Sequence, residues 1–495
     1  MIVYFSGEWI QGLIAGIIVL STVSADVPLL GIGGRFPGDV VGDLVLVYVP
    51  IVVLCAGCIY RDVSFRPSTR GSWLFCGFFL WTVLSALVSN GPSRAVALWF
   101  SAHVGLGLLV FLLLEMSVRE RWVRFRSVVL VLLVAVGGQT VVGLTQFLTQ
   151  GTFGLSQLGE GGDATVSVIA IGSISFEAGT FVSGFTGMSF NLANLLVLTL
   201  PVWIVVLFRS TRRLRSLMVG GWIVVSCVVL RATSTDAGRG ALFVGAGCLL
   251  VVLLVSSGVP RTLATMGYNR TQRLLSLCAL LGGLLTSMLP SSTTNSISVH
   301  GAAVNGGSTN SAVTNAQQAG GDSILVKYII SGADRLSQVS IPLFDLSNLG
   351  IRFQQYLAGL RIFVDHPLLG IGGMNYVAVA DQYGVVQPAQ YATPLPIHNI
   401  YILLLAETGI VGLILFFGTL GYVCVYGFRL AWQFDADRLY VMATLAGLIG
   451  TLAFGFWDVL QLYYATGFFP MWIVAGAIAG KYDRVLTQSI QACAR

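Results

Sequence analysis

The sequence predicts an all-α, polytopic membrane protein with about twelve transmembrane helices, and three observations predict it. Hydrophobic residues make up 55% of the 495 residues and charged residues only 10%, whereas soluble proteins carry about 25% charged residues. Runs of roughly 20 apolar residues, enough for a helix to cross a bilayer, recur along the chain. The runs are continuous, which excludes the short alternating strands of a membrane β-barrel.

Twelve apolar runs are expected to form these helices, with both termini in the cytoplasm. The runs cover residues 10–30, 42–60, 72–90, 95–115, 127–149, 188–208, 217–230, 240–258, 274–290, 399–427, 439–457 and 462–480. Basic residues follow every even-numbered run, and cytoplasmic loops retain lysine and arginine. This placement accounts for most of the net charge of +6, so we expect the lipid bilayer, and no nucleic acid, as a partner.

The chain divides into three parts by this topology. Residues 1–290 hold spans one to nine, residues 291–398 form a large outward loop, and residues 399–495 hold spans ten to twelve with a short cytoplasmic tail. The loop opens with a Ser/Thr/Asn/Gly tract at 291–320, which has too little apolar surface to form a core. No internal repeat and no second soluble domain is visible.

Later in this loop, residues 350–365 are expected to form an amphipathic helix at the membrane surface. Apolar side chains recur there at helical spacing, and polar ones lie offset from them. The apolar positions are Phe353, Leu357, Leu360 and Val364. The helix is expected to end at the Asp-His-Pro sequence of 365–367, before a glycine-rich turn.

Several arginines lie on the outward side, where the charge rule does not require them. They are Arg94, Arg231, Arg239, Arg352 and Arg361. Arginine is costly near hydrocarbon, and beside a cavity it indicates function. Its planar donors bind phosphate oxygens bidentately. The alternative is that each one extends to lipid headgroups or pairs with a nearby aspartate. Several of them around one cavity would bind a pyrophosphate at the membrane surface.

His398 lies where the long loop re-enters the membrane. An imidazole there can act as a general base on a sugar hydroxyl or, when protonated, hold an anionic leaving group; the alternative is a residue that only begins a helix. Glu407, nine positions later, falls on the opposite side of a helix and is interpreted as a structural contact. The outward side has no acidic cluster, so no metal and no cofactor is expected.

Two segments around these residues resemble the O-antigen ligase and polymerase superfamily of membrane glycosyltransferases. His-Asn at 398–399, followed after nine residues by Gly-Ile-Val-Gly at 409–412, resembles the ligase pattern H-N-x9-G-x-x-G. Arg352 and the residues up to 376 resemble the family's R…F…HPLxGxGxxxF segment just upstream.

Two further segments resemble the family with one difference each. Gly-Arg-Gly-Ala at 238–241 is similar to an SRGA element, with Gly238 where serine is usual. Residues 183–201 are similar to a G-x-F-x-x-x-N-x-x-A…P segment, and Val182 stands where the family has an arginine.

The resemblance implies transfer of a glycan from a polyprenyl-pyrophosphate donor to an acceptor hydroxyl on a lipid, glycan or protein. Members act at the outer face of the cell (inner) membrane, resemble inverting transferases, and need neither metal nor nucleotide. Carried onto this chain, Arg239 and Arg352 would bind the pyrophosphate. His398 would deprotonate the acceptor or assist the departing pyrophosphate. Arg94 and Arg231 are further phosphate candidates from charge placement.

Three functions remain open on this basis. The first is a ligase that transfers a preassembled glycan, which the H-N-x9-G-x-x-G pattern favours. The second is a polymerase that extends the glycan on its lipid carrier, using the same fold and similar residues. The third is a transporter or flippase, which would predict repeated halves and ionisable residues near the bilayer midplane. The charges instead lie at the outer ends of the spans.

Overall fold

The computed structural model describes sixteen stretches of the chain. They are residues 8–24, 26–28, 43–45, 47–60, 66–149, 151–155, 158, 160, 167–171, 174–178, 182–210, 212–233, 235–255, 349–385, 395–432 and 437–493. The predicted span at 274–290 and the tract at 291–320 lie outside these residues, so both stay predictions.

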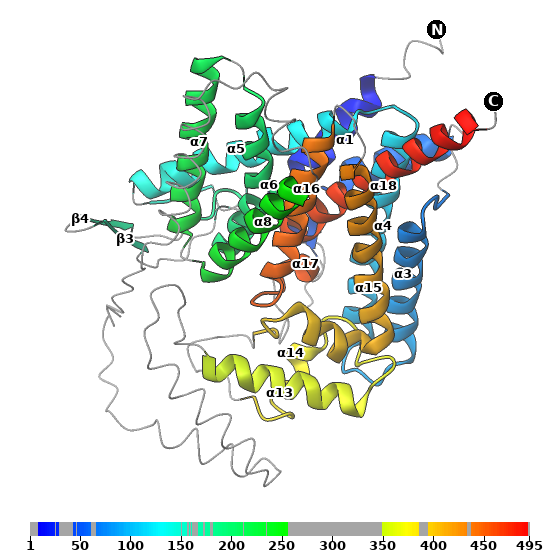
Figure 1. Ribbon diagram of the computed structural model, residues 1–495. Coiled ribbons are helices and arrows are strands. Elements are labelled where there is room, and N and C mark those ends of the chain that lie inside the picture. The colour runs from blue at the N-terminus through cyan, green and yellow to red at the C-terminus, as the bar shows by residue number, and fades with distance from the viewer. Residues whose placement is uncertain are drawn as a thin grey trace.

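The described chain is helical, and most helices lie within a few residues of the predicted runs. They are α1 (Glu8–Leu20), α2 (Tyr48–Tyr60), α3 (Arg70–Val88), α4 (Arg94–Arg119), α5 (Phe125–Thr149), α6 (Ser189–Phe208), α7 (Arg213–Ala232), α8 (Asp236–Val255), α13 (Leu349–Asp365), α14 (Tyr376–Val379), α15 (Ile400–Trp432), α16 (Arg438–Phe454), α17 (Leu460–Tyr463) and α18 (Ala465–Cys493) (Figure 1).

Two short antiparallel strand pairs are an addition to the predicted all-α fold. Strand β1 (Asp26–Pro28) pairs with β2 (Asp43–Val45), and β3 (Ser167–Ile171) pairs with β4 (Ile174–Ala178). In the second pair Ser167 lies opposite Ala178. Both pairs lie in connections between helices, so the helical core is unchanged.

Six described helices are long and apolar enough to cross a membrane: α3, α4, α5, α6, α7 and α15. They make the chain a multi-pass membrane protein, because a helix satisfies its own backbone polar groups in lipid. Helices α1, α2, α8 and α16 are apolar over shorter lengths. The predicted total of twelve spans stays a prediction.

Helix α18 is enclosed by the rest of the bundle. All its residues from Thr466 to Lys481 are buried, and α18 packs most extensively on α4. Gly476 and Gly480 permit this close approach, because a Cβ at either position would overlap the carbonyl oxygen of Phe111 or Glu115 on α4. Small residues of this kind let helix backbones touch inside membranes.

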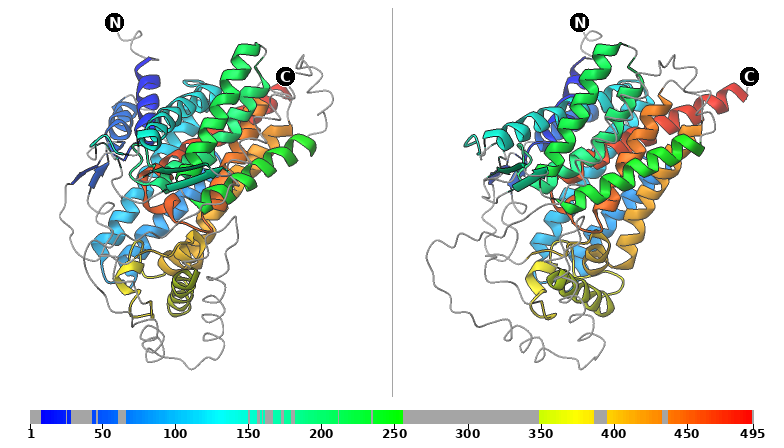
Figure 2. Two further views of the ribbon diagram at one scale, coloured as in Figure 1. Left: turned by 90° about the vertical axis from the view of Figure 1, so that its left-hand side faces the viewer. Right: turned by 60° about the vertical axis from the view of Figure 1, so that its left-hand side comes forward.

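Helices α13 and α14 lie across one end of the bundle, which we call the α13 end. Figures 1 and 2 show α13 below the long helices, with the start of α1 and the end of α18 at the opposite end. The start of α1 and the end of α18 therefore lie on the same side of the bundle. That this side is cytoplasmic stays a prediction from the arginine distribution.

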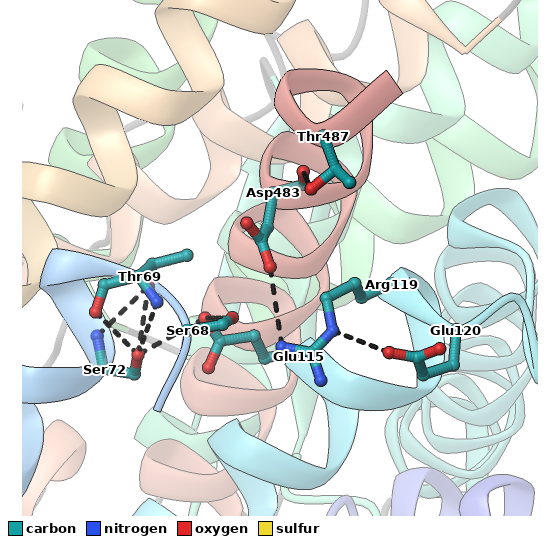
Figure 3. Close-up of polar contacts among 8 residues, drawn as sticks. All are labelled: Ser68, Thr69, Ser72, Glu115, Arg119, Glu120, Asp483 and Thr487. Carbon is teal, nitrogen blue, oxygen red and sulfur yellow. Dashed lines mark hydrogen bonds and ion pairs between the residues drawn. The ribbon is translucent and has the colours of Figure 1, made fainter. Parts of the chain in front are cut away.

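A polar cluster joins three helices at the end opposite α13 (Figure 3). Buried Glu115 of α4 accepts hydrogen bonds from Ser68 Oγ at 2.9 Å and Ser72 Oγ at 3.3 Å. Arg119 of α4 forms an ion pair at 3.5 Å with Asp483 of α18. This cluster fixes α3, α4 and α18 far from the α13 end, where the predicted site residues lie.

Candidate functional site

Helix α15 is broken at Gly409, near its start. Gly409 has φ 68° and ψ −175°, a conformation that essentially only glycine adopts. A Cβ there would also overlap the carbonyl oxygen of Leu368. Residues 400–408, the first nine residues of α15, therefore form a segment separate from the longer helix that follows. The span predicted over 399–427 is present as α15, and the break at Gly409 is an addition to that prediction.

Backbone groups freed by the break find partners in the turn at 370–376, which we call the glycine turn. The amides of Ile371 and Gly372 donate to the carbonyls of Ala406 and Glu407 at 3.1 and 2.9 Å. An unsatisfied backbone polar group costs roughly several kcal/mol in an apolar environment. A break in a helix therefore needs hydrogen-bond partners of this kind. The motif segments at 352–376 and 398–412 thus supply hydrogen-bond partners to each other.

Glu407 holds the glycine turn against the bundle. This buried carboxylate accepts hydrogen bonds from the amides of Met374 at 2.8 Å and Tyr376 at 3.1 Å, and from Tyr463 Oη at 2.5 Å. These contacts connect α15 to α14 and α17. The interpretation of Glu407 as a structural contact agrees with this geometry.

Asn399 fixes the start of α15. Its Oδ1 accepts hydrogen bonds from the amides of Tyr401 at 3.0 Å and Ile402 at 3.1 Å, as a helix N-cap does. Its Nδ2 donates to the Phe456 carbonyl at 3.2 Å. The asparagine of the His-Asn motif therefore ties the start of α15 to the connection between α16 and α17 (residues 455–459).

His398 lies just before α15, and α13 holds it in place. Its ring Nδ1 lies 3.1 Å from Gln355 Oε1, and its backbone N–H donates to the same oxygen at 3.4 Å. Tyr356 Oη donates to the His398 carbonyl at 3.1 Å. The helix predicted for 350–365 is thus the element that positions the histidine.

Helix α13 turns one side to the protein. Its protein-facing side carries Gln355, Ala358 and Ile362, which are fully buried. The predicted apolar stripe points away, so that Leu360 is 41% and Val364 73% exposed. The periodicity identified the helix correctly. The side of α13 that the protein covers is the one that contacts His398.

Arg352 lies one turn before Tyr356, on the same side of α13 as Gln355. Its Nη1 donates to the Trp457 carbonyl at a long 3.5 Å, its one hydrogen bond within the described residues. A guanidinium has five N–H donors, so most remain for an anion. Buried Asp458 follows Trp457; burial raises the pKa of this carboxyl to about 6, and the charge of Arg352 opposes that rise.

Arg231 and Arg239 lie on either side of the connection between α7 and α8, and both are buried. Gly238, next to Arg239, packs against the Phe454 ring, which a Cβ would approach to 3.4 Å. The amide of Ile400 in turn donates to the Gly455 carbonyl at 2.8 Å. The start of α8 and the start of α15 therefore meet at the same end of α16.

Arg94 stands apart from this group. It is exposed at the first position of α4. The preceding Ser93 exchanges hydrogen bonds with Asn375 of the glycine turn, at 3.1 and 3.2 Å. These contacts place Arg94 beside the glycine turn, and not among the residues that contact His398.

The structure thus arranges three sequence segments around residues 454–461. The apolar pattern predicted this stretch only as the end of one span and the start of the next, and no role was predicted for Gln355 or Asp458. An acid in an otherwise apolar region was the available signal for Asp458. No signal was available for Gln355, because its partner lies 43 positions away.

The electrostatic environment keeps His398 neutral. Burial lowers the pKa of His398 from 6.5 to about 4, the positive charge of Arg352 lowers it further, and a hydrogen bond with the Pro396 backbone opposes both. The side chain is nonetheless partly exposed. A neutral imidazole that reaches the surface accepts protons.

The low pKa of His398 should make stability depend on pH. Between pH 4 and 6.5 the unfolded chain binds more protons at this residue, so stability falls as the pH drops through this window. The loss is at most about 3 kcal/mol, and smaller where solvent screens the partly exposed ring. We expect His398→Asn to weaken this acid sensitivity, measured as unfolding midpoints in detergent at pH 7.5 and 4.5. Equal midpoint shifts in the two proteins would contradict the prediction.

The fold and this cluster define a class: a multi-pass helical membrane protein with arginine and imidazole side chains gathered at one end of the bundle. Residues 223–417 match the family model described as O-Antigen ligase. This match supports a relation to the O-antigen ligase and polymerase superfamily. The family indicates a membrane glycosyltransferase-type enzyme with a lipid-linked glycan substrate. The match includes Arg231, Arg239, Arg352 and His398. No curated protein matches the chain.

Proposed function

We propose that this chain is a ligase that transfers a preassembled glycan from a polyprenyl-pyrophosphate carrier to an acceptor hydroxyl at the outer face of the cell membrane. One observation carries the proposal: Arg352 and His398 lie together where α13 meets the α16–α17 connection. The guanidinium of Arg352 suits a phosphate anion, and the imidazole of His398 is a neutral base.

In this reaction His398 removes the proton of the acceptor hydroxyl while its oxygen attacks the anomeric carbon of the donor sugar. The bond from that carbon to the pyrophosphate oxygen breaks, and the electron pair leaves with polyprenyl pyrophosphate. Attack opposite the leaving group inverts the anomeric centre. Arg352 and Arg239 stabilise the growing negative charge, and the proton on His398 passes to water.

Donor binding also prepares the base. Without donor, the charge of Arg352 contributes to the low pKa of His398. A pyrophosphate bound to Arg352 neutralises that charge and adds negative charge near the ring, which raises the pKa of the imidazole. His398 therefore becomes a stronger base only when donor is present, so donor binding precedes acceptor activation.

Two arginine variants and one control test the proposal. Purified protein is incubated with a polyprenyl-pyrophosphate-linked glycan and an acceptor, with EDTA present. We expect Arg239→Ala and Arg352→Ala each to reduce transfer about 10²–10³-fold, the loss typical of removing one charge-stabilising group. Arg361→Ala should change little, because Arg361 lies on the other side of α13 and donates to the Tyr383 carbonyl at 3.2 Å.

The product distribution separates the possible reactions. One large addition to a distinct acceptor means a ligase, and a ladder of lengths on the carrier means a polymerase. Loss of wild-type transfer on chelation contradicts the metal-independent mechanism. Equal losses in Arg361→Ala and Arg352→Ala contradict the assignment of the pyrophosphate site.

A further inference from the structure

The histidine ring has two nitrogens, and only one can carry the lone pair that accepts a proton. Which nitrogen that is depends on the partner of the other. His398 Nδ1 lies 3.1 Å from the side-chain amide of Gln355, and the backbone N–H of His398 lies 3.4 Å from the same atom of that amide. The ring and the backbone N–H of His398 therefore both contact one atom of the Gln355 side chain.

This double contact determines the protonation of the ring. A backbone N–H only donates, so the amide atom that faces it must be the oxygen of Gln355 and not the nitrogen. The same oxygen faces Nδ1, and an oxygen without hydrogen only accepts. These two contacts therefore favour a proton on Nδ1, which leaves the lone pair of the neutral ring on Nε2.

We propose that Gln355 is a positioning residue, which holds His398 as the Nδ1–H tautomer so that Nε2 is the atom that accepts the acceptor's proton. This inference rests on the proposed function for its chemistry. Gln355 is fully buried, so water does not compete for its oxygen. It lies on the same side of α13 as Arg352, so one helix positions both the base and the pyrophosphate ligand.

The charged groups near the ring are compatible with this role. Arg352 on α13 acts on His398 directly, and Asp458 after α16 acts on Arg352. The amide of Gln355 is neutral, so it orients the imidazole without raising its affinity for protons. A carboxylate in the same place would orient the ring equally well and would also stabilise its protonated form.

Three variants test the proposal, with histidine-selective ¹⁵N NMR in detergent as a readout that needs no activity. The His398 signals are assigned by difference from His398→Asn. We expect wild type to show Nδ1 protonated and Nε2 unprotonated at neutral pH. Gln355→Glu should keep this tautomer and raise the His398 pKa by about 1–3 units. Gln355→Leu should release the ring to a mixture of tautomers. Gln354→Glu, the same charge one position along α13, should change neither property.

The pH dependence of transfer gives the second readout. Gln355→Glu should move the acidic limb of the rate profile upward by the pKa change seen in NMR, and should retain activity at higher pH. Gln355→Leu should lower the rate at all pH values.

The proposal is overturned if Gln355→Leu leaves the tautomer of His398 unchanged. It is also overturned if Gln355→Glu leaves the acidic limb of the rate profile in place. If His398→Ala transfers as fast as wild type, the proposed function fails instead, whatever NMR shows for Gln355.

Discussion

Replacing His398 with alanine is expected to lower glycan transfer by about 10²–10⁴-fold, the usual contribution of a positioned general base. The residue is the one neutral imidazole in the Arg352 and Asp458 cluster, and its pKa near 4 keeps it unprotonated in the working range. The loss should appear mainly in kcat, because the donor pyrophosphate is held by the arginines.

His366 provides the matched control for this prediction. It lies in the same loop, directly after α13, and its amide donates to the Ile362 carbonyl at 2.9 Å. His366→Ala should retain transfer within about threefold, since surface substitutions away from a site have small effects. If His398→Ala behaved like His366→Ala, His398 would only begin a helix and another base would be required.

Replacing Gly409 with alanine is expected to have the largest effect on folding. The φ of 68° and ψ of −175° at this position cost a non-glycine residue about 1–3 kcal/mol. The new Cβ would also meet the backbone of Leu368 and Leu369, which cannot move without losing the hydrogen bonds of the glycine turn. We therefore expect little folded protein, or a markedly lower unfolding midpoint in detergent.

Gly421 tests whether the effect comes from the break and not from glycine content. It lies on the same helix, and a Cβ there meets nothing within 4 Å. Gly421→Ala should leave the unfolding midpoint unchanged or slightly raised, because alanine stabilises helices relative to glycine. Equal midpoints for the Gly409 and Gly421 variants would show that α15 does not need the break.

The two effects are linked through α15. The break at Gly409 separates residues 400–408 from the rest of α15, and Asn399 fixes the start of this segment on the α16–α17 connection. His398 precedes this start directly. A variant that straightens the helix would therefore displace His398, so residual folded Gly409→Ala protein should also transfer poorly.

Much of the fold followed from the sequence itself. Within the described residues, the apolar runs gave the positions of the helices, because a segment in lipid must satisfy its own backbone and present apolar side chains. The helix at 349–365 was visible in the periodicity of its apolar residues. Gly409 and Gly412 were visible as a motif, and Arg352 and His398 as polar residues in an apolar chain.

Tertiary structure alone decided which of these residues meet. Apolar periodicity shows that a segment is helical, but a helix facing lipid and one enclosed by protein, such as α18, need similarly apolar surfaces. The pattern therefore left open which side of α13 the protein covers. The pairing of Gln355 with His398 and the position of Asp458 beside Arg352 depend on contacts between distant segments, which no local pattern contains. The sequence by itself determined the helices and the reactive residue types, and the packing determined the site.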